Sequence, residues 1–447
     1  MHKIKQIIHA RSQQFLALLL GIAAFSTYFC MYAFRKPFTA GSFHDVELWG
    51  IDYKIILVIA QVLGYATAKG LGIKIVSEVQ PTQRAKYILG MIALAGICLL
   101  LFGIVPPPYN FGFMYFNGLC LGMVYGLVFS FLEGRQITEI LGAGLAISFI
   151  ISSGIVKSIG KVFINMGVSE YWMPFFTGVL FFPLLLISVY GLTLAPNPTE
   201  KDQKDRSART PMNADARKNF LQKYGIGLIA LIMVYVLMTI LRDIRDNFGV
   251  EIWKELGVSD ASIFSKTEII IGLIICTLTA LLYFIKDHKR AFWLNHLMIF
   301  VGCILIFTST LLFQNRFINP FIWTILMGTG LYMAYVPFNG MLFDRLLATL
   351  KEKANVGFLF YLADFSGYLG SVFILIYQNF GSKNASWLNY LTELSLILPI
   401  FCMILVLISF VYFSRKLVVD LVLEQSTIRR ITPDRAKKPL SGVNPKP

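Results

Sequence analysis

The chain consists of long apolar stretches separated by short polar segments. Most stretches approach the roughly 20 residues with which an α-helix crosses a hydrocarbon core of about 30 Å. We therefore predict an all-α integral membrane protein with about twelve transmembrane helices. Their expected positions are residues 14–34, 53–76, 86–105, 111–133, 140–163, 172–194, 221–245, 266–286, 292–313, 320–343, 354–378 and 391–414.

The composition agrees with a lipid environment. Hydrophobic residues make up 56% and charged residues 15% of the 447 residues, and the mean hydropathy is +0.66. The formal net charge of +15 does not indicate nucleic-acid binding, because Lys and Arg punctuate the apolar stretches instead of forming a stripe on a soluble domain. We expect membrane lipid as the surroundings, a monomer, and no nucleic-acid partner.

The sequence carries no signature of an enzyme or a metal site. It has no Walker-type glycine-rich loop, and its five His have no metal-ligand spacing. The six Cys lie singly inside apolar stretches and indicate neither disulfides nor a metal site. We therefore predict a protein that is not an enzyme, holds no cofactor or metal, and is not a pump driven by ATP.

One polar segment divides the chain in two. Residues 196–219, PNPTEKDQKDRSARTPMNADARKN, are charged and contain Pro, which is typical of a flexible linker. We expect a bundle of six helices at 1–195, a second at 220–416 and a basic tail at 417–447. Cationic loops lie on the side of the linker and both termini, so the positive-inside rule predicts that this side is cytoplasmic, in the cell (inner or plasma) membrane.

The two predicted bundles resemble each other in sequence. Tyr28 and Tyr235 are 207 residues apart, and so are Arg35 and Arg242. A second series has an offset of 210, in which Gly118, Tyr125 and Arg135 match Gly328, Tyr335 and Arg345. Similar offsets at separate places indicate a duplicated six-helix unit. Two six-helix repeats joined by a cytoplasmic linker resemble the major facilitator superfamily, whose substrate site lies near the membrane midplane between the halves.

The first helix carries a more specific pattern. Tyr28, Tyr32 and Arg35 are spaced to share one helical face, and Lys36 and Phe38 follow. This segment resembles the Y-x3-Y-x2-R-K-x-F pattern of the organophosphate:phosphate antiporters, which include glycerol-3-phosphate and hexose-phosphate transporters. The resemblance implies that Arg35 binds phosphate, with Tyr28 and Tyr32 beside it.

Further positions match that family. Arg242 stands twelve residues before Lys254, as the family's second phosphate-binding Arg precedes a Lys-Glu pair, and Tyr235 precedes it on the same helix. The segments GYATAKG and FSKTEIIIG imply functional roles for Lys69 and Glu268. A departure lies in the fifth helix, where Lys157 stands at the place of a family His and supplies a third cation near the expected cavity.

The same residues also permit a structural interpretation. Tyr, Arg and Lys at a helix end commonly anchor it in the headgroup layer, and Lys36 in particular would then mark the membrane surface. Asp243 and Asp246 adjoin Arg242 and Arg245, so a local salt-bridge cluster is an alternative, in which Arg245 pairs with one of these acids. No acid lies near Arg35 and Lys36 in sequence, and we expect their neutralising charge to come with the ligand.

Other charged residues suggest coupling or gating. Asp364 lies in the middle of an apolar stretch, as a candidate for proton coupling or for pairing with Lys157 or another cation. Two acid and base pairs stand near the cytoplasmic ends of the fourth and tenth helices, where gating salt bridges are expected. They are Glu133 with Arg135 and Asp344 with Arg345.

Charges inside a membrane cost roughly 2.5–3.5 kcal/mol each on insertion scales and usually mark functional sites. Arg offers a planar fork that suits phosphate or carboxylate. We therefore predict a secondary active transporter of small anionic metabolites, working by alternating access, with organophosphate and phosphate exchange as the specific hypothesis. The alternatives are a transporter-like membrane receptor for an anionic ligand and a flippase for an anionic lipid.

Overall fold

The computed structural model describes residues 13–44, 46–132, 138–194, 214–339, 341–350, 352, 354, 356–381 and 386–431. Glu133 and Arg135, most of the predicted linker and the end of the predicted tail lie outside these residues. The described chain is almost entirely helical, and eleven of its helices are long and apolar enough to cross a membrane. A shorter apolar helix at Leu18–Tyr32 corresponds to the first predicted span. The prediction of an all-α, multi-pass membrane protein is therefore confirmed.

The helices before the predicted linker follow the predicted spans closely. They are α2 (Gln13–Tyr32), α3 (Tyr53–Glu78), α4 (Arg84–Ile104), α5 (Phe111–Leu121), α6 (Val124–Leu132), α7 (Thr138–Asn165) and α8 (Met173–Thr193). A 3-10 turn, η1 (Pro37–Ala40), follows α2. Two short strands, β1 (Glu47–Leu48) and β2 (Ile51–Asp52), pair antiparallel before α3.

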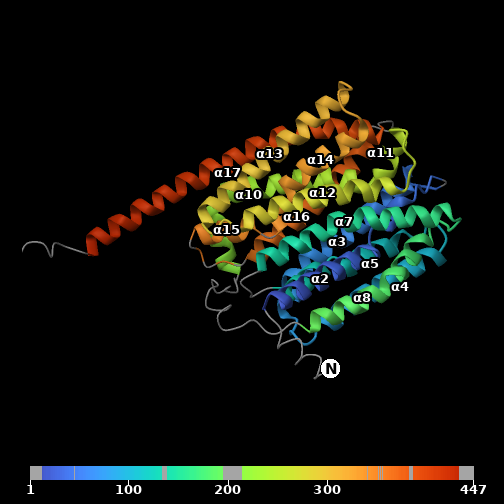
Figure 1. Ribbon diagram of the computed structural model, residues 1–447, viewed down its shortest axis with the longest axis horizontal. Helices are drawn as coiled ribbons and strands as arrows, with labels where there is room; N and C mark the ends of the chain where they lie inside the picture. The colour runs from blue at the N-terminus through green and yellow to red at the C-terminus, as the bar shows by residue number, and fades with distance from the viewer. Residues whose placement is uncertain are drawn as a thin grey trace, which may run out of the picture.

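The second series of helices repeats this plan with small additions. It contains α10 (Ala214–Asn247), α11 (Gly249–Glu255), α12 (Ser262–Tyr283), α13 (His288–Gln314), α14 (Pro320–Tyr335), η2 (Val336–Asn339), α15 (Leu342–Thr349), α16 (Val356–Gly381) and α17 (Trp387–Ile431). The last helix extends beyond the predicted span 391–414 and projects from the bundle in Figure 1.

The two series of helices lie on opposite sides of the molecule. Figure 1 shows α2 to α8 on one side and α10 to α17 on the other. Across the boundary α7 packs against α12, and α3 packs against α16. We refer to these groups as the first half (residues up to 194) and the second half (residues from 214). The exact domain bounds stated above remain a prediction.

Small residues allow the helices of one half to approach closely. A Cβ atom on Gly118 of α5 would lie 2.1 Å from the carbonyl oxygen of Gln61 in α3, and one on Gly64 of α3 would lie 2.0 Å from that of Tyr115. The second half uses the same device, since a Cβ on Gly330 would lie 2.6 Å from the oxygen of Gly302. Such contacts are common between membrane helices, where close backbone packing stabilises association.

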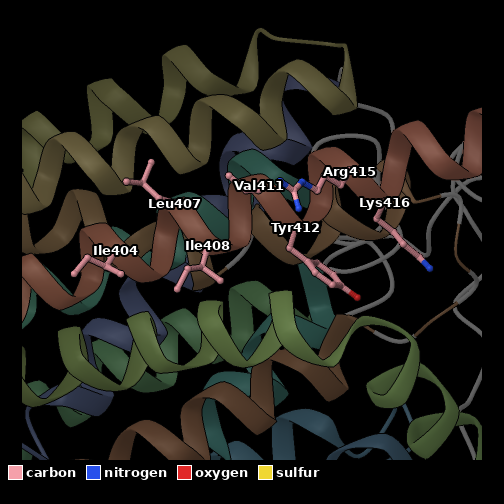
Figure 2. A pocket seen from close by; sticks show the side chains of 7 residues that line it. All are labelled: Ile404, Leu407, Ile408, Val411, Tyr412, Arg415 and Lys416. Carbon is pink, nitrogen blue, oxygen red and sulfur yellow. The ribbon is translucent and has the colours of Figure 1, made fainter.

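Apolar side chains cover the outside of the protein, while many charged side chains lie inside. The outer face of α17 shows this arrangement in Figure 2, where a shallow groove is lined by Ile404, Leu407, Ile408 and Val411 and ends at Tyr412, Arg415 and Lys416. These four aliphatic side chains are all more than a third exposed. An apolar surface that turns basic at one end fits a helix that leaves the hydrocarbon core there.

Candidate functional site

Arg35 and Lys36 lie inside the protein, just after the end of α2. Their backbone N–H groups both bond to the carbonyl of Tyr32, which closes the last turn before Pro37 starts η1. Each residue is only 3% exposed. The interpretation of these two cations as headgroup anchors is therefore wrong, because both are buried in the contact between the halves.

Aromatic rings surround the Arg35 guanidinium. Its central carbon lies 3.7 Å from the centre of the Tyr65 ring, and Nη1 donates to the Tyr32 hydroxyl over 3.5 Å. Among the described residues no carboxylate pairs with Arg35, and its Nε has no hydrogen-bond acceptor. Arg35 therefore keeps several N–H donors available in a buried, aromatic environment.

Arg242 occupies the equivalent place in the second half. Its Nη2 and Nε donate to Asp243 over 2.7 and 3.1 Å, and Nη1 donates to the Tyr335 hydroxyl. The ring of Tyr368 in α16 is close to both arginines, with its centre 5.7 Å from the Arg35 guanidinium carbon and 5.3 Å from that of Arg242. The structure thus brings together the two Arg that the repeat pairs in sequence.

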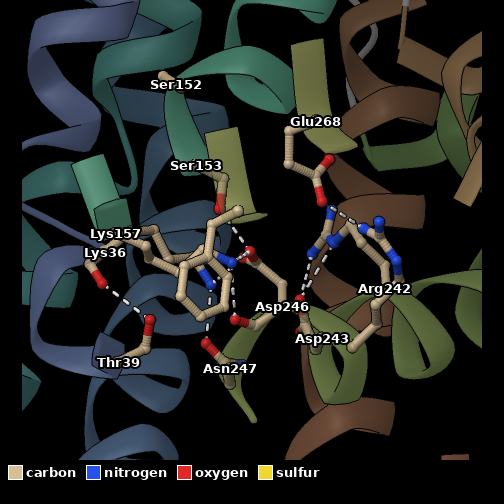
Figure 3. A network of polar contacts seen from close by, with 12 residues as sticks. Lys36, Thr39, Ser152, Ser153, Lys157, Arg242, Asp243, Asp246, Asn247 and Glu268 are labelled. Atoms are coloured by element: carbon tan, nitrogen blue, oxygen red, sulfur yellow. Dashed lines mark hydrogen bonds and ion pairs between the residues drawn. The ribbon is translucent and has the colours of Figure 1, made fainter. Parts of the chain in front are cut away.

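Asp246 joins cations of the first half to the second half. Its carboxylate lies 2.5 Å from Lys36 Nζ and 2.6 Å from Lys157 Nζ, and it also accepts a hydrogen bond from Ser153 (Figure 3). Lys36 additionally donates to Asn247 over 2.7 Å. The expectation that a ligand neutralises Lys36 is therefore wrong, because an acid far away in sequence does so.

Arg245 pairs with an acid on another helix. Its Nη1 lies 2.7 Å from the Glu268 carboxylate of α12, so the prediction that Arg245 pairs with Asp243 or Asp246 is wrong. Successive residues on a helix point in different directions, and Arg245 therefore faces α12 while Asp246 faces α7. Asp243 does pair with Arg242, as the salt-bridge alternative predicted.

Another ion pair joins the two halves at Lys69. The Nζ of Lys69 in α3 lies 2.7 Å from Asp364 in α16, and both side chains are nearly fully buried. Tyr235 donates to the other oxygen of Asp364 over 2.5 Å, and its hydroxyl lies 2.7 Å from that of Tyr335. Lys69 is thus the cation that pairs with Asp364, while Lys157 has a different partner.

Tyrosine contacts repeat in both halves. Tyr28 packs on Tyr125 with ring centres 5.2 Å apart, and the equivalent Tyr235 packs on Tyr335 at 4.8 Å. Tyr28 also packs edge-on against Tyr32 at 5.5 Å. These contacts lie on equivalent helices, which supports the duplicated unit inferred from the offsets.

Tyr65 and Tyr368 both contact Arg35, although neither residue was predicted from the sequence. Their rings meet edge-on with centres 4.8 Å apart across the two halves. A signal was present, because Tyr65 precedes Lys69 by four residues and Tyr368 follows Asp364 by four. Residues four apart share a helical face, so both tyrosines belong to the same surface as these charges.

Polar contacts also join the two halves on either side of the charged and aromatic residues described above. On the side of η1, Lys54 of α3 pairs with Glu251 of α11 over 2.6 Å. At the other end, the Tyr125 hydroxyl donates to the backbone oxygen of Asn339 over 3.0 Å. Both contacts join the first half to the second.

The predicted gating residues are placed only in part. Asp344 and Arg345 lie in α15, where Arg345 is 5% exposed and its Nη1 lies 3.0 Å from His288 Nδ1. Their role in gating remains a prediction. Glu133 and Arg135 are outside the part of the chain that the structure describes.

Ten charged residues make up what we call the interface network. They are Arg35, Lys36, Lys69, Lys157, Arg242, Asp243, Arg245, Asp246, Glu268 and Asp364. All are buried, and six are cationic while four are acidic. Among the described residues no group of three or more His, Cys, Asp or Glu is placed to hold a metal ion.

Two solved structures with a similar fold are those of transporters. The chain resembles the crystal structure of a D-xylose-proton symporter with a TM-score of 0.58 and 14% identity, over 89% of this chain and 97% of that one. It resembles the human organic anion transporter MFSD10 (TETRAN) with a TM-score of 0.56 and 12% identity, over 89% of this chain and 100% of that one. These similarities confirm the major facilitator fold.

Comparison by sequence gives a match to a protein family. No curated protein matches the chain. A family model matches residues 37–416, which cover most of the chain and include every residue of the interface network except Arg35 and Lys36. The chain therefore belongs to the family described as "Family of unknown function (DUF5690)".

Proposed function

We propose that this protein is a secondary active transporter that carries a small anionic metabolite by alternating access. The observation that carries the proposal is the position of Arg35, buried between the halves against Tyr65, with no acid among the described residues paired to it. Burying an unpaired cation costs several kcal/mol, so such a group is normally retained for a function. An anion bound by Arg35 would offset this cost.

The charge of the interface network supports a dianion. Its six cations exceed its four acids by two. A phosphate monoester carries a charge of about −1.5 to −2 at neutral pH. One such group would balance the network, which favours an organophosphate or phosphate as the substrate class.

The shape of the donor set also suits an anion such as phosphate or carboxylate. Arg35 and Arg242 come from opposite halves and both approach the Tyr368 ring. Guanidinium groups bind phosphate and carboxylate through two parallel N–H bonds. An anion between these arginines would hold the halves together, and its release would let them separate. Of the two similar structures, the organic anion transporter has a named substrate class that agrees with this proposal.

Uptake by the purified full-length protein in lipid vesicles tests the proposal. We expect uptake of at least one compound among phosphate, glycerol 3-phosphate, hexose phosphates and dicarboxylates. Arg35→Ala and Arg35→Lys should both lower uptake at least tenfold, because a Lys at this position lacks the planar fork. Lys266→Ala is the matched control, since Lys266 is 59% exposed in its side chain and should leave uptake unchanged.

Two results would contradict transport and favour the alternatives. Anion binding without any flux would favour a receptor that retains the transporter fold. Movement of an anionic lipid between leaflets, with no uptake of soluble anions, would favour a flippase. Anion binding that Arg35→Ala leaves unaltered would exclude Arg35 as the ligand.

A further inference from the structure

Asp364 is held by one partner from each half. Lys69 of the first half lies 2.7 Å from Oδ2. Tyr235 of the second half donates to Oδ1 over 2.5 Å. Because Tyr235 and Asp364 belong to the same half, a movement that separates the halves removes Lys69 from Asp364 and leaves Tyr235 in place.

A chain of hydrogen bonds joins Asp364 to the anion site. Arg242 donates from Nη1 to the Tyr335 hydroxyl, which lies 2.7 Å from the Tyr235 hydroxyl. Arg242 can only donate and a carboxylate can only accept. Tyr335 therefore donates to Tyr235, and Tyr235 donates to Asp364. A change of ligand at Arg242 is thus connected to Asp364 through two phenols.

Among the described residues, the other ionisable groups that face Asp364 are tyrosines. Besides Lys69 and Tyr235, which were described above, these groups are Tyr125 of α6, Tyr335 of α14, and Tyr361 and Tyr368 of α16. Tyr65 of α3 lies beside Lys69, with its ring centre 5.3 Å from the ammonium. Arg242 is already paired with Asp243. Within the described residues Lys69 is therefore the only cation that pairs directly with Asp364.

The helices that carry this ion pair are packed closely. A Cβ on Gly72 of α3 would lie 3.3 Å from the Tyr361 ring, and one on Gly70 would lie 3.6 Å from the Phe365 ring, both in α16. A carboxylate without a cation is costly in such surroundings, whereas a protonated carboxyl group is much less so.

We infer that Asp364 is a proton-binding site that takes up a proton when Lys69 turns from Asp364 to the anionic substrate. This inference rests on the proposed function. It means that one proton is carried with each anion. The carboxylate takes up a proton from the external solution, forms one O–H bond and becomes neutral. Lys69 keeps its charge and neutralises one negative charge of the substrate, so no covalent bond other than the O–H bond forms or breaks.

Vesicles containing the purified full-length protein and an internal pH-sensitive dye test this inference. The probes are inorganic phosphate and glycerol 3-phosphate. In the wild type we expect a more acidic exterior to speed uptake several-fold and to be accompanied by proton entry. Asp364→Asn cannot bind the proton, so it should retain exchange of labelled for unlabelled substrate but lose the response to the pH gradient.

Two further variants sharpen the test. Glu268→Gln is the matched control, because Glu268 is also a buried acid and its partner Arg245 lies in the same half. It should keep the wild-type number of protons per substrate, whatever its rate. Tyr235→Phe removes one donor to Asp364, which disfavours the carboxylate. The midpoint of the pH dependence of uptake should then shift to higher pH.

The outcomes separate this inference from the proposed function. Proton binding at Asp364 would be overturned if the pH gradient had no effect on wild-type uptake, or if uptake by Asp364→Asn still responded fully to the gradient. Neither result would contradict anion transport. Absence of uptake of any anion would overturn the proposed function instead. If Asp364→Asn does not fold, the midpoint of the pH dependence of uptake in Tyr235→Phe tests the inference. A midpoint equal to that of the wild type would then overturn it.

Discussion

The ammonium of Lys36 lies 2.5 Å from the carboxylate of Asp246, which belongs to the other half of the protein. The same carboxylate is 2.6 Å from Lys157. One acid thus holds two cations of the first half against the second. Transport by alternating access would require these contacts to open on one side of the membrane in each cycle.

Asp246→Ala should strongly destabilise the protein. It leaves Lys36 and Lys157 buried without their acid, and removal of one partner of a buried pair costs about 3–5 kcal/mol. Thermal unfolding of the protein in detergent would measure the loss. Lys266→Ala is the control, because the pair of Lys266 with Asp260 is more than half exposed and its loss should change the melting temperature little. Equal melting temperatures of both variants would contradict the assignment.

Tyr65 should contribute to anion binding through its ring. The Arg35 guanidinium carbon lies 3.7 Å from the ring centre, and a buried cation–π contact contributes about 2 kcal/mol. Tyr65→Ala should therefore weaken phosphate binding by about 10- to 30-fold. Tyr65→Phe keeps the ring and loses only the contact of its hydroxyl with Tyr28, so its affinity should stay close to that of the wild type. Isothermal titration calorimetry distinguishes these outcomes, and equal losses in both variants would exclude a role for the ring.

Lys54 and Glu251 should depend on each other. Lys54→Glu places two carboxylates together, and Glu251→Lys places two ammonium groups together, so each change should lower thermal stability and uptake. The double variant restores opposite charges and should recover part of both, with a coupling energy of about 1–3 kcal/mol. Recovery should be incomplete, because Lys54 also donates to the backbone oxygen of Thr39. Additive losses in the double variant would show that the two residues do not interact.

Gly118 should not tolerate a side chain. A Cβ there would lie 2.1 Å from the backbone oxygen of Gln61, which forces α3 and α5 apart. Gly118→Ala should therefore lower the melting temperature. Gly112 lies on the same helix with open space around it, and Gly112→Ala should be neutral or stabilise the protein by up to about 1 kcal/mol. A neutral effect at Gly118 would contradict the close packing of these helices.

Much of the fold could be predicted because a membrane-spanning helix leaves a local signal. The apolar stretch at 86–105 is found as α4 (Arg84–Ile104), and the stretch at 172–194 is found as α8 (Met173–Thr193). The interruptions of helices inside a membrane-spanning stretch are harder to predict from the sequence. The stretch at 320–343 contains α14, η2 and the start of α15, because turns inside a membrane segment depend on packing with neighbouring helices.

The candidate site could be predicted as a set of residues but not as a set of pairs. The repeat and the family resemblance singled out Arg35, Arg242, Lys69 and Lys157, and all four are buried. Their partners were not predictable, because ion pairs between helices join positions far apart in the chain. Lys36 pairs with Asp246, and Arg245 pairs with Glu268, contrary to expectation.

Hydropathy and residue type are local properties of the chain, so the segments that enter the membrane and the charges that enter with them could be read from the sequence. Which of these charges neutralise each other depends instead on how the helices pack in three dimensions. An acid within a few ångströms stabilises a buried cation, and the packing of α3, α7, α10 and α16 selects that acid where one is present. By this packing Lys36, Lys69 and Lys157 have acids beside them, and among the described residues Arg35 has none.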